Sequence, residues 1–214
     1  MENMENMENV IHGVFPTPVY IVKRDTNLSP KEEKEIRKII DKEGMYKNAG
    51  NSTSNNNYIF NGKLKKIKQF CEQQIKQYVE QVINPEEELD FHITQSWLNI
   101  TKPGENHHSH FHSNSIISGV FYISTEEGDN IIFNDPNSKI KKFLTIETNP
   151  NHPPSAIHYS LHSINNGLLL FPSWIEHGVK PNVKATRDRI SLSFNTFVKG
   201  NLGERKGLDQ LILQ

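Results

Sequence analysis

The spacing of the apolar residues changes at Asp90, and this change limits the folds that the chain can adopt. Before Asp90, apolar residues recur at helical spacing; after it, they alternate with polar residues in short runs separated by turn signals. Regularly spaced short runs of this kind are typical of a β-sandwich or barrel. The predicted strands are residues 91–101, 116–124, 130–133, 142–148, 157–164, 167–171 and 187–198.

The first part of the chain predicts two helices that pack on one of the sheets. Ser29 is placed to cap the first helix, with Pro30 at its first position, and Gly44 follows its predicted end near Lys42. The second helix covers residues 63–82, whose apolar side chains fall on one face. Helices followed by strands make the fold class α+β.

Two other segments before Asp90 have weaker patterns. Residues 14–22 contain two prolines and predict a short strand at a sheet edge. Residues 48–57 are rich in Asn and Ser and predict a loop.

The length of 214 residues fits a single domain. Its predicted parts are a flexible N-terminus (1–13), a helical support (14–90), a β core (91–199) and a C-terminal tail (200–214). The apolar end of the tail predicts docking on the body of the domain or on a second subunit, which leaves a homo-oligomer open.

Composition excludes several classes of protein. A formal net charge of −1 gives no sign of nucleic-acid binding, and no apolar run is long enough for a membrane span. The single cysteine, Cys71, excludes an intrachain disulfide and is typical of a reducing compartment. We therefore expect a cytoplasmic protein, in the host cytoplasm if the protein is viral.

Four histidines lie within six residues, between a Lys-Pro-Gly turn and an apolar run. Clustered imidazoles at the mouth of a strand are typical of paired metal ligands. Side chains two positions apart on a strand share a face, so His110 and His112 can bind one ion. His108 with His110 has the same spacing, and the sequence leaves this register open. An exposed His-rich loop without metal is the third interpretation.

A second stretch, GLLLFPSWIEHGVKPN, supplies His177, and Arg189 follows twelve residues later. Arg189 lies in a predicted strand whose alternate positions are polar. Burying a cation is costly unless an anionic or polar group faces it, so we expect such a ligand in front of Arg189. The alternative is an internal ion pair, for instance with Asp129 or Asp135. The other polar residues on the same face are Ser191, Ser193 and Asn195.

Taken in order, the strand, the Pro-Gly turn, the histidines, SGVFY, FPSW, a histidine, RIS and SFN resemble the Fe(II)/2-oxoglutarate-dependent dioxygenases. The chain is most similar to the small type found in tailed phages and marine bacteria, whose opening the FPTPVY segment also resembles. The resemblance covers most of the chain and is strongest over residues 97–197. It implies a double-stranded β-helix (jelly-roll, cupin-like) as the core.

The resemblance also implies an activity: an oxygenase that converts 2-oxoglutarate (2OG) and O2 to succinate and CO2 while it oxidises a C–H bond of an unknown substrate. A hydroxylase is the expected form of this enzyme. His110, His112, His177 and Arg189 would be its catalytic residues. The implied cofactor ligands are His110, His112 and His177 for Fe(II), and Arg189, Ser191, Tyr122 and Asn99 for 2OG.

The sequence departs from the family pattern at His112, where the usual two-His, one-carboxylate triad has an acid. Asp135 on a neighbouring loop is an alternative source of the carboxylate. A cupin-like metal- or ligand-binding module, or a structural protein without turnover, is the alternative function. Cupins have no need for Arg189 and Ser191, so this pair favours the oxygenase.

Overall fold

The chain pairs its strands into two antiparallel sheets, one of eight strands and one of four, in the residues that the structure describes. The structure is a computed structural model and describes residues 14–138 and 156–214. The predicted flexible N-terminus and the predicted strand 142–148 lie outside these residues.

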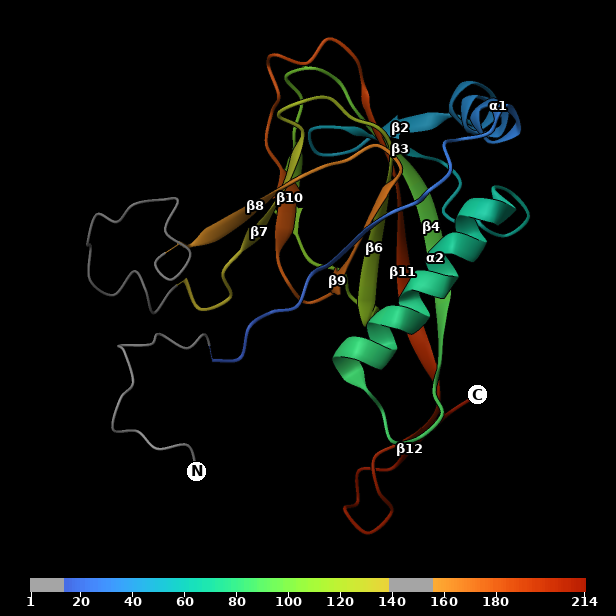
Figure 1. Cartoon of the computed structure of the whole chain (residues 1–214), viewed down its shortest axis with the longest axis vertical. Helices are drawn as coiled ribbons and strands as arrows, with labels where there is room; N and C mark the ends of the chain where they lie inside the picture. The colour runs from blue at the N-terminus through green and yellow to red at the C-terminus, as the bar shows by residue number, and fades with distance from the viewer. Residues whose placement is uncertain (1–13, 139–155) are drawn as a thin grey trace.

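The two sheets face each other, and the larger one lies in the middle of the molecule (Figure 1). The spatial order of the larger sheet is β1 (Tyr20–Lys23), β9 (Gly167–Pro172), β6 (Ile117–Ser124), β11 (Arg189–Leu202), β4 (Asp90–Thr101), β3 (Ser52–Ser54) and β2 (Met45–Lys47), with β12 (Leu211–Leu213) paired to β11. The smaller sheet runs β5 (His107–His110), β10 (His177–Val179), β7 (Asn130–Asn134) and β8 (His158–His162).

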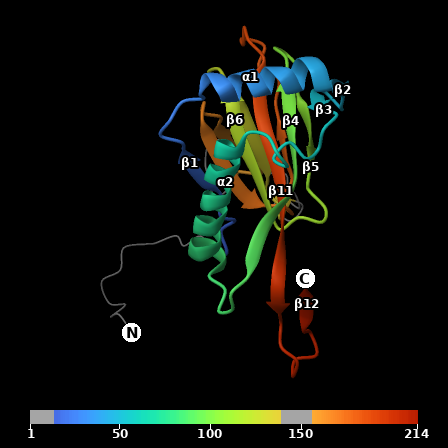
Figure 2. The ribbon, with the colours of Figure 1, turned by 90° about the vertical axis from the view of Figure 1, so that its right-hand side faces the viewer.

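Two helices cover the outer face of the larger sheet (Figure 2). They are α1 (Pro30–Lys38), continued by the π-helical turn η2 (Ile39–Glu43), and α2 (Lys65–Tyr78), continued by η3 (Val79–Ile83). As predicted, Ser29 caps α1, and it forms a capping box with Glu32. Neither helix is long and apolar enough to cross a membrane, nor is any other helix in the described ranges.

Alternating side chains of the larger sheet build two separate cores. On β6, Ile117 and Phe121 point to the helices, whereas Val120 and Tyr122 point to the smaller sheet. On β11, Leu192 and Phe194 join the helical core, so the other face of this strand is turned to the smaller sheet. The predicted polar face of β11 therefore lies between the two sheets.

Several strands differ from the prediction. The predicted loop 48–57 is wrong in part, because β3 lies within it and pairs with β4. The sequence pattern did not indicate this strand because its residues are polar. Thr53 and Ser54 are nevertheless buried, and their hydroxyls bond to residues of β4.

The short strands β2, β5, β10 and β12 were also not predicted. The N-terminal strand begins only at Tyr20, after both prolines, and it lies at the sheet edge as expected. The tail docks on the body, where β12 pairs with β11.

Gly119 makes room for the buried ring of Phe194, its partner across the β6–β11 pair. A Cβ at position 119 would lie 2.0 Å from Phe194 Cζ. We expect Gly119→Ala to lower the free energy of unfolding by about 1–3 kcal/mol, because this core has no space for a methyl group. Urea denaturation measures the loss. The double variant G119A/F194L should recover part of it, and a Gly119→Ala variant as stable as wild type would contradict this packing.

Candidate active site

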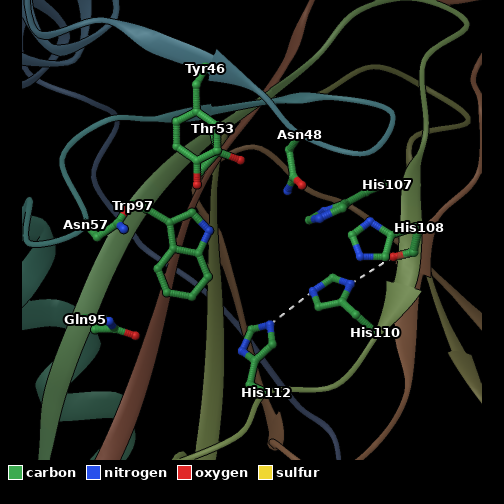
Figure 3. Close-up of a pocket in the computed structure, with 10 residues that line it drawn as sticks. All are labelled: Tyr46, Asn48, Thr53, Asn57, Gln95, Trp97, His107, His108, His110 and His112. Carbon is green, nitrogen blue, oxygen red and sulfur yellow. Dashed lines mark hydrogen bonds between the residues drawn. The ribbon is translucent and has the colours of Figure 1, made fainter.

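Three histidines meet at one end of the space between the sheets. His110 closes β5 and pairs with His177, which opens β10. His112 lies beyond the end of β5, where its backbone N–H donates to Ser173 O at 3.0 Å. The predicted common strand for His110 and His112 is therefore not observed, yet their Nε2 atoms lie 3.1 Å apart (Figure 3). One ligand atom from each of the three imidazoles lies within 4.8 Å of the other two.

The opposite ring nitrogens face hydrogen-bond acceptors. His110 Nδ1 lies 2.8 Å from His108 O, and His177 Nδ1 lies 3.0 Å from Ile175 O. A carbonyl oxygen can only accept, so each Nδ1 carries the proton and each Nε2 of the neutral ring keeps a lone pair. Metal-binding histidines characteristically make this kind of contact through their second nitrogen.

His112 is held from two sides by side chains of the larger sheet. Its Nδ1 lies 2.6 Å from Asn195 Oδ1 and 2.9 Å from Ser118 Oγ. With this Nδ1 donating to Asn195, the lone pairs on the Nε2 atoms of His110 and His112 face each other. A cation between these two lone pairs would remove their repulsion, so the donor set fits a metal ion.

Burial keeps these rings neutral. It lowers the pKa of His177 to about 3 and that of His112 to about 4, and it also lowers the pKa of His110. A neutral imidazole is the form that binds a metal, so protons do not compete for these nitrogens at neutral pH.

The same pKa values predict a loss of stability in acid for the metal-free protein. The His177 pKa is about 3 in the folded chain, against a reference value of 6.5, so between these values only the unfolded chain takes up this proton. The free energy of unfolding should therefore fall as the pH decreases from about 6.5 toward 3. Urea denaturation at about pH 7.5 and about pH 5 measures the change. His177→Gln should show a smaller decrease, and an equal decrease would contradict the assignment.

Asn195 lies on the same face of β11 as Arg189, and its side chain contacts His112, so it is placed to orient that ring. Its contact to His112 spans 83 residues of chain, so only the paired sheet reveals it. We expect Asn195→Ala to weaken metal binding by about 10–100-fold, because His112 loses the acceptor that fixes its ring. Chelator competition measures the affinity. Asn201→Ala, an exposed change on the same strand, is the control, and equal affinities of the two variants would refute this role.

Arg189 lies beside the histidines, and its side chain is buried without an anionic partner. It is 4% exposed, and its Nε has no hydrogen-bond partner within the described residues. No ion pair joins Arg189 to a carboxylate in this part of the chain, so the alternative of a pair with Asp129 or Asp135 is not observed. A buried cation without a counterion calls for an anionic ligand.

The side chains around Arg189 add further polar groups. Its guanidinium lies over the Tyr122 ring, 5.0 Å from the centroid, and Tyr122 Oη is buried without a partner in the described chain. Ser191 lines a small cavity together with Arg189 and the three histidines. Asn99 lines it as well, but its amide is already bonded to Thr53 and Ser193. Of the four residues predicted to bind 2OG, Asn99, Arg189 and Ser191 line this cavity, whereas Tyr122 does not line it and contacts Arg189 instead.

A larger cavity of about 270 Å³ opens over the histidines toward solvent (Figure 3). Its wall opposite the histidines comes from the β2–β3 hairpin and from β4. No Lys, Arg, Asp or Glu is among its described lining residues. They are Tyr46, Asn48, Thr53, Asn57, Gln95, Trp97, His107, His108, His110 and His112.

No carboxylate joins the histidines. Within residues 14–138 and 156–214, the possible metal-binding groups of three side chains contain histidine only, and Asp135 belongs to neither. His108 belongs to a second group, with His107 and His110. The structure therefore shows both of the histidine registers that the sequence left open.

Comparison with known proteins bears on this geometry. Residues 95–195, which contain all three histidines and Arg189, match the family model described as "Putative 2OG-Fe(II) oxygenase". These residues belong to the 2OG-Fe(II) oxygenase family. The family predicted from the sequence is thus confirmed, and so are its enzyme class, 2OG-dependent oxygenase, and its cofactors, Fe(II) and 2OG. A search of curated proteins found no match.

Solved structures of 2OG-Fe(II) oxygenases share the fold. An oxidoreductase of this family from Burkholderia pseudomallei aligns with a TM-score of 0.56 at 7% identity, covering 83% of each chain. A prolyl-4-hydroxylase from Pseudomonas putida aligns with a TM-score of 0.52 at 16% identity, covering 84% of this chain and 92% of the other. HygX from Streptomyces hygroscopicus, solved with nickel and 2-oxoglutarate, aligns with a TM-score of 0.54 at 8% identity, covering 84% and 82%. The predicted α+β fold with a double-stranded β-helix is confirmed.

Proposed function

We propose that this oxygenase holds Fe(II) with three histidines, His110, His112 and His177, and that it hydroxylates a neutral substrate. The observation that carries the proposal is the juxtaposition of three Nε2 lone pairs with an unpaired, buried Arg189 around one cavity. A metal ion would take up the three lone pairs, and a dicarboxylate would supply the missing negative charge at Arg189.

The protein's own part is binding and orientation. Arg189 offers a planar guanidinium fork to the distal carboxylate of 2OG, and Ser191, two positions on, adds a hydroxyl on the same face. Tyr122 Oη and Asn99 are further contacts in this proposal. Iron, when bound, supplies the centre at which O2 and 2OG react. Asn195 and the carbonyls of His108 and Ile175 keep the three imidazoles aimed at it.

The larger cavity indicates the substrate class. Its walls are uncharged, and burying a charged substrate group there would lack a counterion. The indole N–H of Trp97 and the side-chain amide of Asn57 have no hydrogen-bond partner in the described residues, so both are available to a ligand. The Trp97 ring also lies 5.7 Å from the His112 ring. A neutral group with hydrogen-bonding atoms and a flat or apolar face fits against Trp97.

The experiment is to incubate the protein with Fe(II), 2OG and O2 and to measure succinate. We expect succinate formation above the rate without protein even before the substrate is found, because the proposed site holds 2OG next to the metal whether or not a substrate is bound. His162→Ala should retain this reaction, because His162 is exposed on β8 and lines neither the small cavity nor the larger one. Metal binding without succinate would favour the cupin-like module, for which the absence of a carboxylate among the three ligands is the supporting observation.

We also propose a location and an oligomeric state. The buried Cys71 without a disulfide supports a cytoplasmic location. The exposed side chains of Leu211 and Ile212 on β12 support self-association.

A further inference from the structure

A second group of three imidazoles lies on the solvent side of the first. One ligand atom each from His107, His108 and His110 lies within 4.8 Å of the other two. The ring centroids are 5.2 Å apart for His107 and His108, 4.5 Å for His107 and His110, and 5.1 Å for His108 and His110. Figure 3 shows these three rings side by side on β5.

An irregularity in β5 explains why these rings meet. Neighbouring residues of a regular strand point to opposite faces, which would separate His107 from His108. Here His177 pairs with His110 and Val179 with His107, so three steps on β5 match two steps on β10. The extra residue is a β-bulge, a feature that re-aims side chains. Gly178 permits it, because a Cβ there would lie 2.9 Å from His107 O.

The second group lies entirely on the cavity that opens to solvent, whereas the first includes the buried His177. His108 is exposed and His107 half-buried, and both line the larger cavity. His177, by contrast, is 4% exposed and lines only the inner cavity. An ion arriving from solvent therefore meets His107 and His108 before it reaches His177.

The two groups share His110. Its Nδ1 donates to His108 O, so only its Nε2 can bind a metal, and one ion at a time can use it. We propose that His107, His108 and His110 form a second position for a divalent metal ion, which the ion occupies in place of the inner one. Three neutral imidazoles without a carboxylate suit Zn²⁺, Ni²⁺ or Cu²⁺. An ion there would also stand in the cavity that the proposed substrate enters.

Zn²⁺ titration with a competing chelator tests this position without using activity. H112A/H177A removes the inner group and should still bind one Zn²⁺ per chain. Adding H107A and H108A to that variant should weaken the remaining binding by at least about 100-fold. Wild type should bind one Zn²⁺ in total at the inner and outer metal positions, because both positions need His110.

The controls separate this position from the proposed iron site. H107A/H108A, with the inner group intact, should still bind one ion, whereas loss of all binding would show that the outer pair is needed for the inner site and would overturn the proposal. H158A/H162A removes two exposed histidines of β8 and should change nothing. If H112A/H177A folds, as judged by circular dichroism, but binds no Zn²⁺, or binds it equally without His107 and His108, the second position does not exist.

Discussion

Replacing His177 by alanine is expected to weaken Fe(II) binding by more than about 100-fold. His177 supplies one of three ligands and is 4% exposed, so water or a neighbouring side chain cannot take its place without moving the fold. The other two imidazoles would keep their facing lone pairs 3.1 Å apart but lose the third donor. Anaerobic equilibrium dialysis with Fe(II) measures the affinity.

The matched control for this change is His162→Ala, on β8 of the same sheet. His162 is exposed and belongs to neither histidine group, so its loss should leave Fe(II) affinity unchanged. Equal Fe(II) affinity of His177→Ala and His162→Ala would remove His177 from the site.

Arg189→Met should abolish 2OG binding while it leaves Fe(II) binding in place. Methionine keeps the apolar part of the side chain but lacks the guanidinium fork that pairs with a carboxylate. Loss of such a buried pair costs about 3–5 kcal/mol, or roughly 150- to 5,000-fold in affinity. Calorimetric titration of 2OG into the Fe(II) protein measures the loss. Arg189→Lys keeps the charge without the fork and should bind 2OG between wild type and Arg189→Met.

The metal-free protein should respond to Arg189→Met in the opposite direction. Because the guanidinium is buried and makes no ion pair with a carboxylate in the described chain, its removal should leave the free energy of unfolding unchanged or raised. Arg187→Met is the control, since Arg187 is exposed and paired with Glu126 at 2.9 Å, away from the cavity. A large destabilisation by Arg189→Met without any change in 2OG affinity would assign Arg189 a purely structural role.

Local signals in the sequence predicted much of the fold. The cap at Ser29 and the helical spacing after residue 63 define both helices, and alternation defines β4, β6 and β11 to within a few residues. The short motifs around His110, His177 and Arg189 resemble the oxygenase family, and it was this resemblance that predicted which residues would meet. Each of these signals lies within one short segment, which is why it can be read without the fold.

What the sequence did not predict depends on pairing between distant segments. The residues of β3 are polar, and they form a strand because they pair with β4 and make buried hydrogen bonds to it. The bulge in β5 exists only against β10, and the role of Asn195 exists only because β11 passes His112. These features form only when the sheets are assembled, so the spacing of residues within one segment cannot predict them.

The central claim is that a three-histidine site and Arg189 hold Fe(II) and 2OG together. Its most direct test is the visible absorption of the protein with Fe(II) and 2OG under anaerobic conditions. We predict a weak charge-transfer band that needs both additions, persists in His162→Ala and disappears in His177→Ala and Arg189→Met. Fe(II) binding without a band in wild type would contradict the claim.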